Sequence, residues 1–457
     1  MAELPINLKI KNGLNPEKLE LVQCRSLLRA VPGKRHVYDG RWDNKAVIIK
    51  LFSKKFSAHH HLKKEWRGLN LLRKYKLNVP EPLFFGQTTD RRWAIVTGKI
   101  ADSSTVLEVF NNAEDNQNRF RILILVCREL AKQNEKGVFQ KDLHLGNFLV
   151  SKDTVYALDP AQMKFFHQPL CRAKSICQLA LFSCYLPDDD IDLFDKLCRE
   201  YFDLRGWQFD HVKKALVLKN RDRHRKERIK KSLKKCMRTS KKVLEISTTQ
   251  HFALFDRSFI DSINPIDFIN QIDFLMDAGQ ILKKGNTSYV CRINFNGKDI
   301  VVKRYNHKGL VHSLRHTMIG SRARRNWLYG HRLGILKIPT PKPLAFIEKK
   351  RVGLVWQSYI VTDYVDGQKL CDFLKNNQPE QQSFLFMKKR LETLMKKLSK
   401  YRITHGDLKH TNVLVSKDDV VLTDLDSLKF HRFKFGYKIR QSKDVERLKQ
   451  SGQVDFF

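Results

Sequence analysis

Two segments of this 457-residue sequence each place an aspartate, an asparagine five residues later and a second aspartate twelve residues after that. Carboxylate and amide oxygens are suitable Mg²⁺ ligands, and a carboxylate beside a hydroxyl group can accept its proton. The spacing therefore predicts a catalytic base followed by two metal ligands. The three residues are Asp142, Asn147 and Asp159 in the first segment, and Asp407, Asn412 and Asp424 in the second.

A lysine precedes each segment at the end of an apolar run, Lys50 in AVIIKLF and Lys303 in DIVVKRY. Phosphoryl transfer requires alignment and charge neutralisation more than covalent chemistry, and a strand lysine can neutralise the α- and β-phosphates of a nucleotide. Glu65 follows Lys50 in HLKKEWRGL and is expected to pair with it. Taken alone, each of these residues fits an ordinary surface position. Their order along the chain favours a nucleotide site.

Further candidates accompany these two sets. Lys409, two residues after Asp407, is positioned to contact the γ-phosphate during transfer, whereas the first segment has His144 at the matching place. Gly33 and Gly285 precede the lysine strands and are candidates for phosphate-covering turns, although neither belongs to a full glycine triplet. Ordinary turn glycines explain them about equally well.

The two sets belong to a longer internal repeat. Each aspartate or asparagine of the first segment is 265 residues before its counterpart, and the strings LVSKD and Ile-Val-Thr recur at the same offset. Apolar strand-like runs at 46–52 and 299–305 precede helical patterns at 61–75 and 321–333, and long helices are expected at 119–133 and 382–399. The expected fold is α+β, with a small strand-rich lobe and a helical lobe occurring twice in tandem.

The charge of the chain is extreme. It has 86 Lys and Arg against 48 Asp and Glu, a net charge of +38. Such a field favours a polyanionic partner, which could be nucleic acid, an anionic membrane face or a phosphorylated glycolipid. The N-terminal residues lack the apolar core of a signal peptide, and the nine scattered cysteines fit a reducing compartment. The longest apolar runs, such as 122–127, are too short to span a bilayer, so any contact with a membrane is expected to be peripheral.

A strongly basic stretch lies between the two copies. Residues 219–242 contain 13 Lys or Arg against Asp222 and Glu227. It is interpreted as a partly helical connector, either a solvated linker or a docking strip for anionic phosphates. The predicted organisation is a first kinase-like domain at 1–218, a basic linker at 219–245 and a second kinase-like domain at 246–457.

At these residues the chain resembles the protein-kinase-like superfamily, and more closely the bacterial lipopolysaccharide core kinases, which phosphorylate Kdo or heptose sugars. The similarity lies in KKEWRGLNLLRKYKLNVPEPL of the first copy, and in SRARRNWLYGHRLGILKIPTPKPL, HGDLKHTNVLV and LTDLDSL of the second. The resemblance implies ATP, Mg²⁺ and a lipid-linked anionic oligosaccharide at the cytoplasmic face of the inner membrane. Nucleic acid is then a disfavoured partner.

Two positions depart from that pattern. The second copy has Asn326 where the first has Glu65, so either another acid pairs with Lys303 or that lysine is held more loosely. The first copy reads Asp159-Pro160-Ala161, without a second aspartate, and the proline is expected to stiffen this loop. Both sites are expected to bind nucleotide. The alternatives are a kinase-like enzyme for a small molecule or a protein, and a kinase-like scaffold with one degenerate domain.

Overall fold

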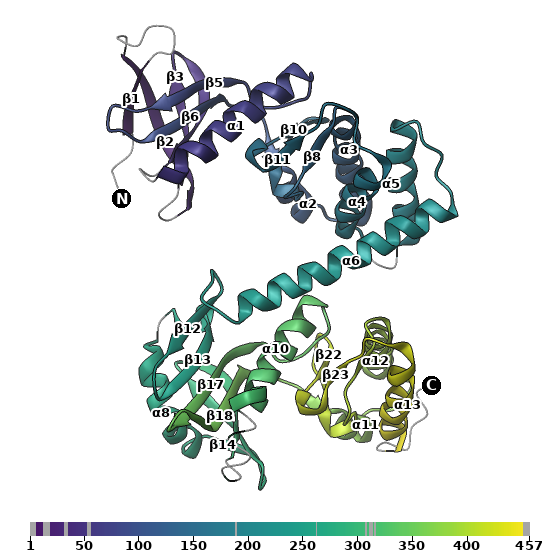
Figure 1. The fold of residues 1–457 in the computed structure, drawn as a ribbon. Helices are drawn as coiled ribbons and strands as arrows, with labels where there is room; N and C mark the ends of the chain where they lie inside the picture. Colours follow the sequence, from purple (N-terminus) through teal and green to yellow (C-terminus); the bar gives the residue numbers. More distant parts are fainter. Residues whose placement is uncertain are drawn as a thin grey trace. The chain divides into compact units, whose positions relative to one another are not determined.

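The structure is a computed structural model, and it describes residues 6–450 apart from 12–18, 32–34, 53–55, 188–189, 262, 307–308, 310–313 and 315–316. The chain divides into two units, Met1–Lys226 and Glu227–Phe457. Each unit has a large antiparallel sheet that is followed along the chain by a mostly helical part (Figure 1). The mixture of helices and strands agrees with the predicted α+β class.

The sheet of the first unit has six strands in the order β1-β2-β3-β4-β6-β5. On β4, Val47, Ile49 and Leu51 are buried, so Lys50 projects from the opposite face of the strand. Helix α1 (Phe56–Lys74) follows β4 and buries Leu62 and Leu69 in a small cluster with the sheet. The strands are β1 (Ile6–Lys11), β2 (Leu19–Val31), β3 (Arg35–Trp42), β4 (Lys45–Phe52), β5 (Pro82–Gln87) and β6 (Trp93–Gly98).

The helical part of the first unit is built around α3 (Asn116–Glu135). Asp115 precedes this helix and caps it, because its side chain accepts from the Asn118 amide. Short strand pairs on this helical core carry the loops with Asp142 and Asp159. The other elements are β7 (Ser104–Thr105), α2 (Val106–Asn112), β8 (Val138–Gln140), β9 (Phe148–Ser151), β10 (Thr154–Ala157), β11 (Met163–Phe165), α4 (Arg172–Phe182) and α5 (Ile191–Leu204).

The basic connector lies mostly on helix α6 (His211–Cys236), which begins before residue 219. Its first half is packed into the first unit, because Val217 is buried and the Arg221 guanidinium donates to the Leu186 carbonyl at 2.9 Å. The boundary between the two units falls within this helix. Its second half carries exposed cations including Lys230, Lys231 and Lys234.

The sheet of the second unit has seven strands in the order β12-β13-β17-β18-β16-β15-β14. Helix α8 (Pro265–Asp277) packs on it through Phe268 and Ile272, and its Asp273 accepts from Arg304 and Lys349 of the sheet. The other elements are β12 (Val243–Ser247), β13 (His251–Asp256), α7 (Arg257–Ile260), β14 (Gln280–Lys284), β15 (Ser288–Phe295), β16 (Lys298–Tyr305), α10 (Arg322–Ile335), β17 (Pro343–Arg351) and β18 (Leu354–Asp363).

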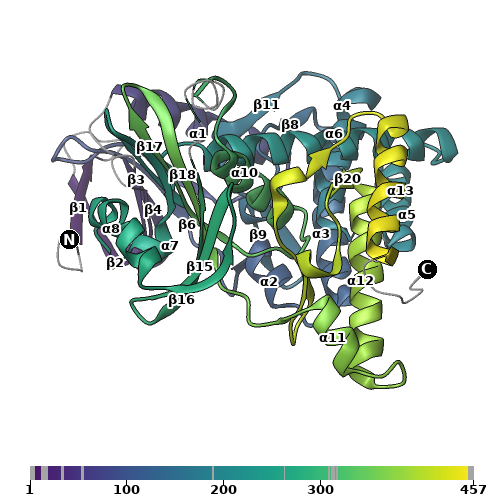
Figure 2. The same ribbon diagram turned by 90° about the horizontal axis from the view of Figure 1, so that it is seen from below.

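The helical part of the second unit packs around α12 (Gln382–Lys400), whose Met387, Leu391 and Leu394 are buried. Within this unit, α11, α12 and α13 gather on one side of α10 and α8 lies on the other (Figure 2). The remaining elements are β19 (Gln368–Lys369), α11 (Leu370–Asn376), β20 (Ile403–Thr404), β21 (Val413–Val415), β22 (Val420–Leu422), β23 (Lys429–Phe430) and α13 (Lys434–Gln450).

The strand and helix predictions near the candidate residues are confirmed, because 46–52 and 299–305 lie in β4 and β16 and the four helical patterns fall on α1, α10, α3 and α12. Among the described residues, no helix combines the length and the apolar character needed to cross a bilayer.

Candidate functional site

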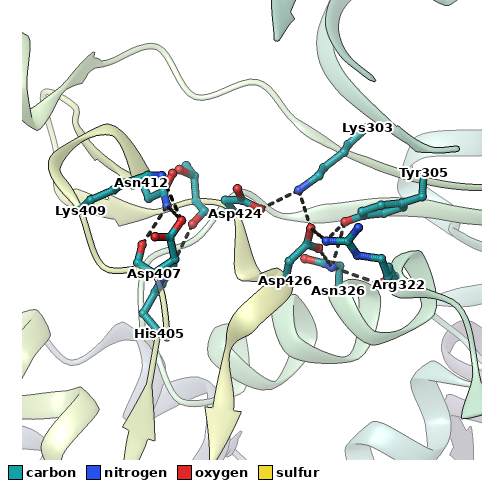
Figure 3. Close-up of polar contacts among 11 residues, drawn as sticks. Lys303, Tyr305, Arg322, Asn326, His405, Asp407, Lys409, Asn412, Asp424 and Asp426 are labelled. Carbon is teal, nitrogen blue, oxygen red and sulfur yellow. Dashed lines mark hydrogen bonds and ion pairs between the residues drawn. The ribbon is translucent and has the colours of Figure 1, made fainter. Parts of the chain in front are cut away.

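In the second unit, Asp407 and Asn412 lie on one loop that ends in a short 3-10 helix, His410–Asn412. The Asn412 side chain donates to the Asp407 carbonyl at 2.8 Å and to its carboxylate at 3.0 Å (Figure 3). The Asn412 carbonyl in turn accepts from the Thr423 amide at 2.9 Å. This last bond joins the loop to Thr423, the residue that precedes Asp424. Hydrogen bonds therefore link the segments that carry Asp407, Asn412 and Asp424.

Asp424 follows strand β22 and adopts a left-handed backbone conformation, with φ of 54°. Its carboxylate lies 2.6 Å from the Lys303 ammonium group, which projects from β16 (Figure 3). The strand lysine and the metal-ligand candidate are 121 residues apart in sequence. The fold therefore brings together the strand-rich and helical parts of this unit at the predicted residues.

A second aspartate of the same loop, Asp426, contacts Lys303 at 2.9 Å. Four donors surround its carboxylate, and it is only 12% exposed. Burial alone would raise the pKa of Asp426, but the charges of Lys303 and Arg322 and the Tyr305 hydrogen bond outweigh it and hold the pKa below its ordinary value. The donors are Lys303, Tyr305, Arg322 and Asn326.

Lys303 therefore pairs with two acids of this loop, Asp424 and Asp426, whereas the helix supplies Asn326 in place of an acid. Asn326 lies on α10, and its amide donates to Asp426 at 2.6 Å. The helix thus holds the carboxylate through a hydrogen bond and does not supply a carboxylate of its own. Sequence reasoning missed Asp426, and the signal was the second aspartate of Asp424-Leu425-Asp426.

The environment of Asp407 keeps it ionised. Its carboxylate lies 3.2 Å from the Lys409 ammonium group. Partial burial raises the pKa of Asp407, but the hydrogen bond and charge of Lys409, together with the bond from Asn412, lower it further and leave it below the ordinary value. An ionised carboxylate beside a cation can accept a proton from a hydroxyl group and keep a phosphate close.

The loop before Asp407 is held by helix α13. The buried Asp444 carboxylate accepts from the amides of His405 and Gly406, at 2.7 Å and 2.9 Å. The His405 ring also contacts the Thr423 carbonyl at 2.9 Å. Gly406 has φ of 79°, a backbone conformation that is unfavourable for residues other than glycine. Sequence reasoning missed Asp444, because nothing local links position 444 to the loop.

The first unit repeats much of this loop geometry. The Asn147 side chain donates to the Asp142 carbonyl at 2.9 Å, and the Asn147 carbonyl accepts from the Leu158 amide at 2.8 Å. Asp159 has φ of 54°, the same value as Asp424. His144 replaces Lys409 and lies 3.8 Å from the Asp142 carboxylate.

The lysine of the first unit has a different partner. Lys50 forms an ion pair with Glu65 of α1, which is 1% exposed, as the sequence predicted. Arg35 of β3 lies 3.4 Å from the Asp159 carboxylate. Burial raises the pKa of Asp159, yet the charges of Lys50 and Arg35 lower it below its ordinary value. Arg35 was not foreseen, since an arginine as the first residue of a strand gives no distinguishing pattern.

The two units thus place the acid that pairs with the strand lysine on different elements. The first has Glu65 on the helix and Ala161 in the loop, and the second has Asn326 on the helix and Asp426 in the loop. Phe52 of β4 matches Tyr305 of β16, so the hydroxyl group that binds Asp426 is also specific to the second unit.

The glycine candidates are less informative. Gly285 lies in the turn between β14 and β15, and its amide donates to the Ser288 carbonyl at 3.1 Å. Gly33 lies outside the described residues. Over the described part of the chain, no three His, Cys, Asp or Glu side chains converge as a metal site. An aspartate with an asparagine and nucleotide phosphates is nevertheless a set that suits Mg²⁺, so Asn412 and Asp424 fit that ion.

The second unit thus has the arrangement of a phosphotransferase. Comparison with family models agrees, because residues 274–455 match the lipopolysaccharide kinase (Kdo/WaaP) family. The matched segment contains Lys303, Asp407, Asn412 and Asp424, and residues 1–273 lie outside it. A search of curated proteins found no match to the chain.

Proposed function

We propose that this protein transfers the γ-phosphate of ATP to a sugar hydroxyl of the lipopolysaccharide core, on Kdo or heptose, and that the transfer takes place in the second unit. The contact of Lys303 with Asp424 is the observation that carries the proposal, because it brings a phosphate-binding cation to a metal-binding carboxylate. The family match over residues 274–455 supports the choice of substrate class.

Each residue has a defined role in this proposal. Lys303 binds the α- and β-phosphates, and Asp426 keeps its ammonium group in place. Asn412 and Asp424 would hold Mg²⁺, which supplies charge neutralisation when bound. Asp407 accepts the proton of the sugar hydroxyl group while the hydroxyl oxygen bonds to the γ-phosphorus of ATP. The bond between the γ-phosphorus and the bridging oxygen of the β-phosphate breaks, and ADP leaves. Lys409 contacts the transferring phosphate.

The first unit is proposed to be a second kinase-like domain that also binds ATP with Mg²⁺. The proposal assigns Lys50, paired with Glu65, to the phosphates, Asp142 to the base position, and Asn147 and Asp159 to the metal. The common loop hydrogen bonds of Asn147 and Asn412 support a duplication, with domains at 1–218 and 246–457 and the basic segment 219–245 between them.

The acceptor is proposed to be an anionic, lipid-linked oligosaccharide reached at the cytoplasmic face of the inner membrane. The net charge of +38 supports this choice, because a positive surface attracts phosphorylated glycolipids and anionic membranes. The association is peripheral in this proposal.

The test is ATP-dependent phosphorylation of purified core oligosaccharide by the full chain and by Asp407→Asn, Asp142→Asn and the double variant. We expect Asp407→Asn to lose at least about 100-fold in transfer rate, a loss typical of a missing catalytic base. Asp142→Asn is expected to retain transfer to the sugar.

Transfer by Asp407→Asn at the wild-type rate would refute the assignment of the reaction to the second unit. Transfer from ATP to a small hydroxylated compound or to a protein, but to no core oligosaccharide, would support the alternative substrate class. A double variant that phosphorylates as fast as wild type would show that neither site is the catalyst.

A further inference from the structure

Three large apolar side chains are exposed where helix α13 begins. Phe433 is 70% exposed, Phe435 is 79% exposed and Ile439 is 48% exposed. Tyr437, between them in sequence, is buried, so the helix is fixed to the unit by one face and presents the apolar side chains on another. We call Phe433, Phe435 and Ile439, with the cations around them, the α13 patch.

The segment that carries the patch is uniformly basic. Residues 429–443 contain six Lys or Arg and no Asp or Glu. Four of the cations alternate with the apolar residues and have exposed side chains, and the Arg432 guanidinium lies 5.4 Å from the centre of the Phe433 ring. These four are Arg432, Lys434, Lys438 and Arg440.

The first unit has no such patch at the matching place. At the 265-residue offset, Gln168 corresponds to Phe433 and Leu170 to Phe435. Leu170 is 3% exposed, and its carbonyl accepts from the buried Arg205. The matching segment of the first unit therefore folds with its apolar side chain buried. The exposure of Phe433 and Phe435 in the second unit needs its own explanation.

The patch is joined to the segment that carries the proposed base. Strand β23 pairs with β20, where Lys429 lies opposite Thr404. Thr404 is three residues before Asp407 in sequence. The His431 ring contacts the Thr404 hydroxyl at 2.8 Å, and the Arg402 side chain donates to the Arg432 carbonyl at 3.0 Å. The base of the patch is thus held to the same strand pair as the catalytic loop.

From these observations we infer that the α13 patch binds the surface of an anionic lipid bilayer, with Phe433, Phe435 and Ile439 entering the headgroup region and the neighbouring cations contacting lipid phosphates. Aromatic side chains mixed with Lys and Arg are typical of such interfacial segments. A nucleic-acid surface fits less well, because Ile439 has no planar group to stack on a base.

Docking through this patch would place the Asp407 loop next to lipid-linked hydroxyl groups. That consequence rests on the proposed function, whereas the binding itself does not. The binding is tested without ATP or acceptor, so its failure and the failure of the proposed function are distinguishable. Asp407→Asn is expected to bind vesicles as wild type does.

The test is co-sedimentation of the full chain with vesicles of phosphatidylglycerol and phosphatidylethanolamine in equal parts, and with vesicles of phosphatidylcholine alone. We expect binding to the anionic vesicles only. Phe433→Ser with Phe435→Ser should weaken it at least about tenfold, since each ring loses apolar burial. Lys434→Gln with Lys438→Gln should weaken it and reduce its dependence on salt.

Matched controls are Phe274→Ser, an exposed ring on α8, and Lys388→Gln with Lys389→Gln, exposed lysines on α12. Unchanged melting temperatures in all variants show that folding is preserved. Equal loss in patch and control variants would overturn the inference, as would full vesicle binding by the double Phe variant. A patch variant that changes only self-association or only binding to a single-stranded oligonucleotide would also overturn it.

Discussion

The side-chain amide of Asn326 lies 2.6 Å from the Asp426 carboxylate, which also pairs with Lys303. In the first unit a glutamate, Glu65, stands at the position of this asparagine and pairs with the lysine directly. The second unit therefore keeps the lysine's acidic partner but places it in the loop after β22. An asparagine at position 326 is therefore compatible with an intact ion pair between Lys303 and Asp426.

This relationship predicts a rescue. Asp426→Ala should lower kcat/KM for ATP by about 10- to 100-fold, because the Lys303 ammonium group loses its fixed position. Adding Asn326→Glu copies the Glu65 and Ala161 arrangement of the first unit and should recover part of the loss. The measurement is steady-state kinetics with ATP varied. Asn326→Glu alone should be harmful, since it places a second carboxylate against Asp426, and a double variant no better than Asp426→Ala would contradict the exchange.

Nucleotide stoichiometry tests whether both units bind ATP. We expect two molecules of a non-hydrolysable ATP analogue per chain, measured by calorimetry with Mg²⁺ present. Lys303→Met and Lys50→Met should each reduce the number to one, because each removes the cation that binds the phosphates in one unit. Lys389→Gln, on the surface of α12, serves as the control. A wild-type chain that binds a single nucleotide would contradict the proposal for the first unit.

The hydrogen bonds between Asp444 of helix α13 and the loop that carries Asp407 predict a stability effect. Asp444→Ala leaves the amides of His405 and Gly406 without their acceptor, and should lower the free energy of unfolding of the second unit by about 1–3 kcal/mol. Amide hydrogen exchange in residues 403–412 measures it. Glu446→Ala, an exposed position on the same helix, should have little effect. Equal exchange in the two variants would show that Asp444 does not hold the loop.

Glu129 predicts a dependence of stability on pH. Burial of Glu129 on α3 raises the pKa of its carboxyl group to about 7. The Gln133 hydrogen bond and the Lys132 charge lower this pKa but only partly offset the effect of burial. Between its ordinary pKa and about 7, the folded chain retains a proton that the unfolded chain has released. Stability therefore falls as the pH rises through that window. Glu129→Gln should stabilise the first unit by about 2–3 kcal/mol above this window and have little effect below it.

Amide hydrogen exchange along α3 at about pH 5 and about pH 8 measures this effect, after correction for the intrinsic rates. Glu114→Gln is the matched control, since Glu114 is exposed just before the helix. The same protection in Glu129→Gln and wild type at the higher pH would contradict the assignment.

The order and clustering of the candidate residues were predictable from sequence because they lie in two short segments with a fixed spacing, and their catalytic roles remain predictions. The pairing of Lys50 with Glu65 was predictable for the same reason, as a strand lysine followed by a helix acid. Asp444 was not, because its role depends on how α13 packs against a loop nearly forty residues earlier. Asp426 was visible as a residue, but its role depends on the Tyr305 hydroxyl and the Asn326 amide, which only the fold brings together.

The most direct measurement is the mass of a Kdo- or heptose-containing core acceptor after incubation with the full chain, ATP and Mg²⁺. The account predicts that the acceptor gains one phosphate group with wild type and with Asp142→Asn, and gains none with Asp424→Asn or Lys303→Met. An acceptor left unmodified by the wild-type chain, or phosphorylated equally well by Asp424→Asn, would contradict it.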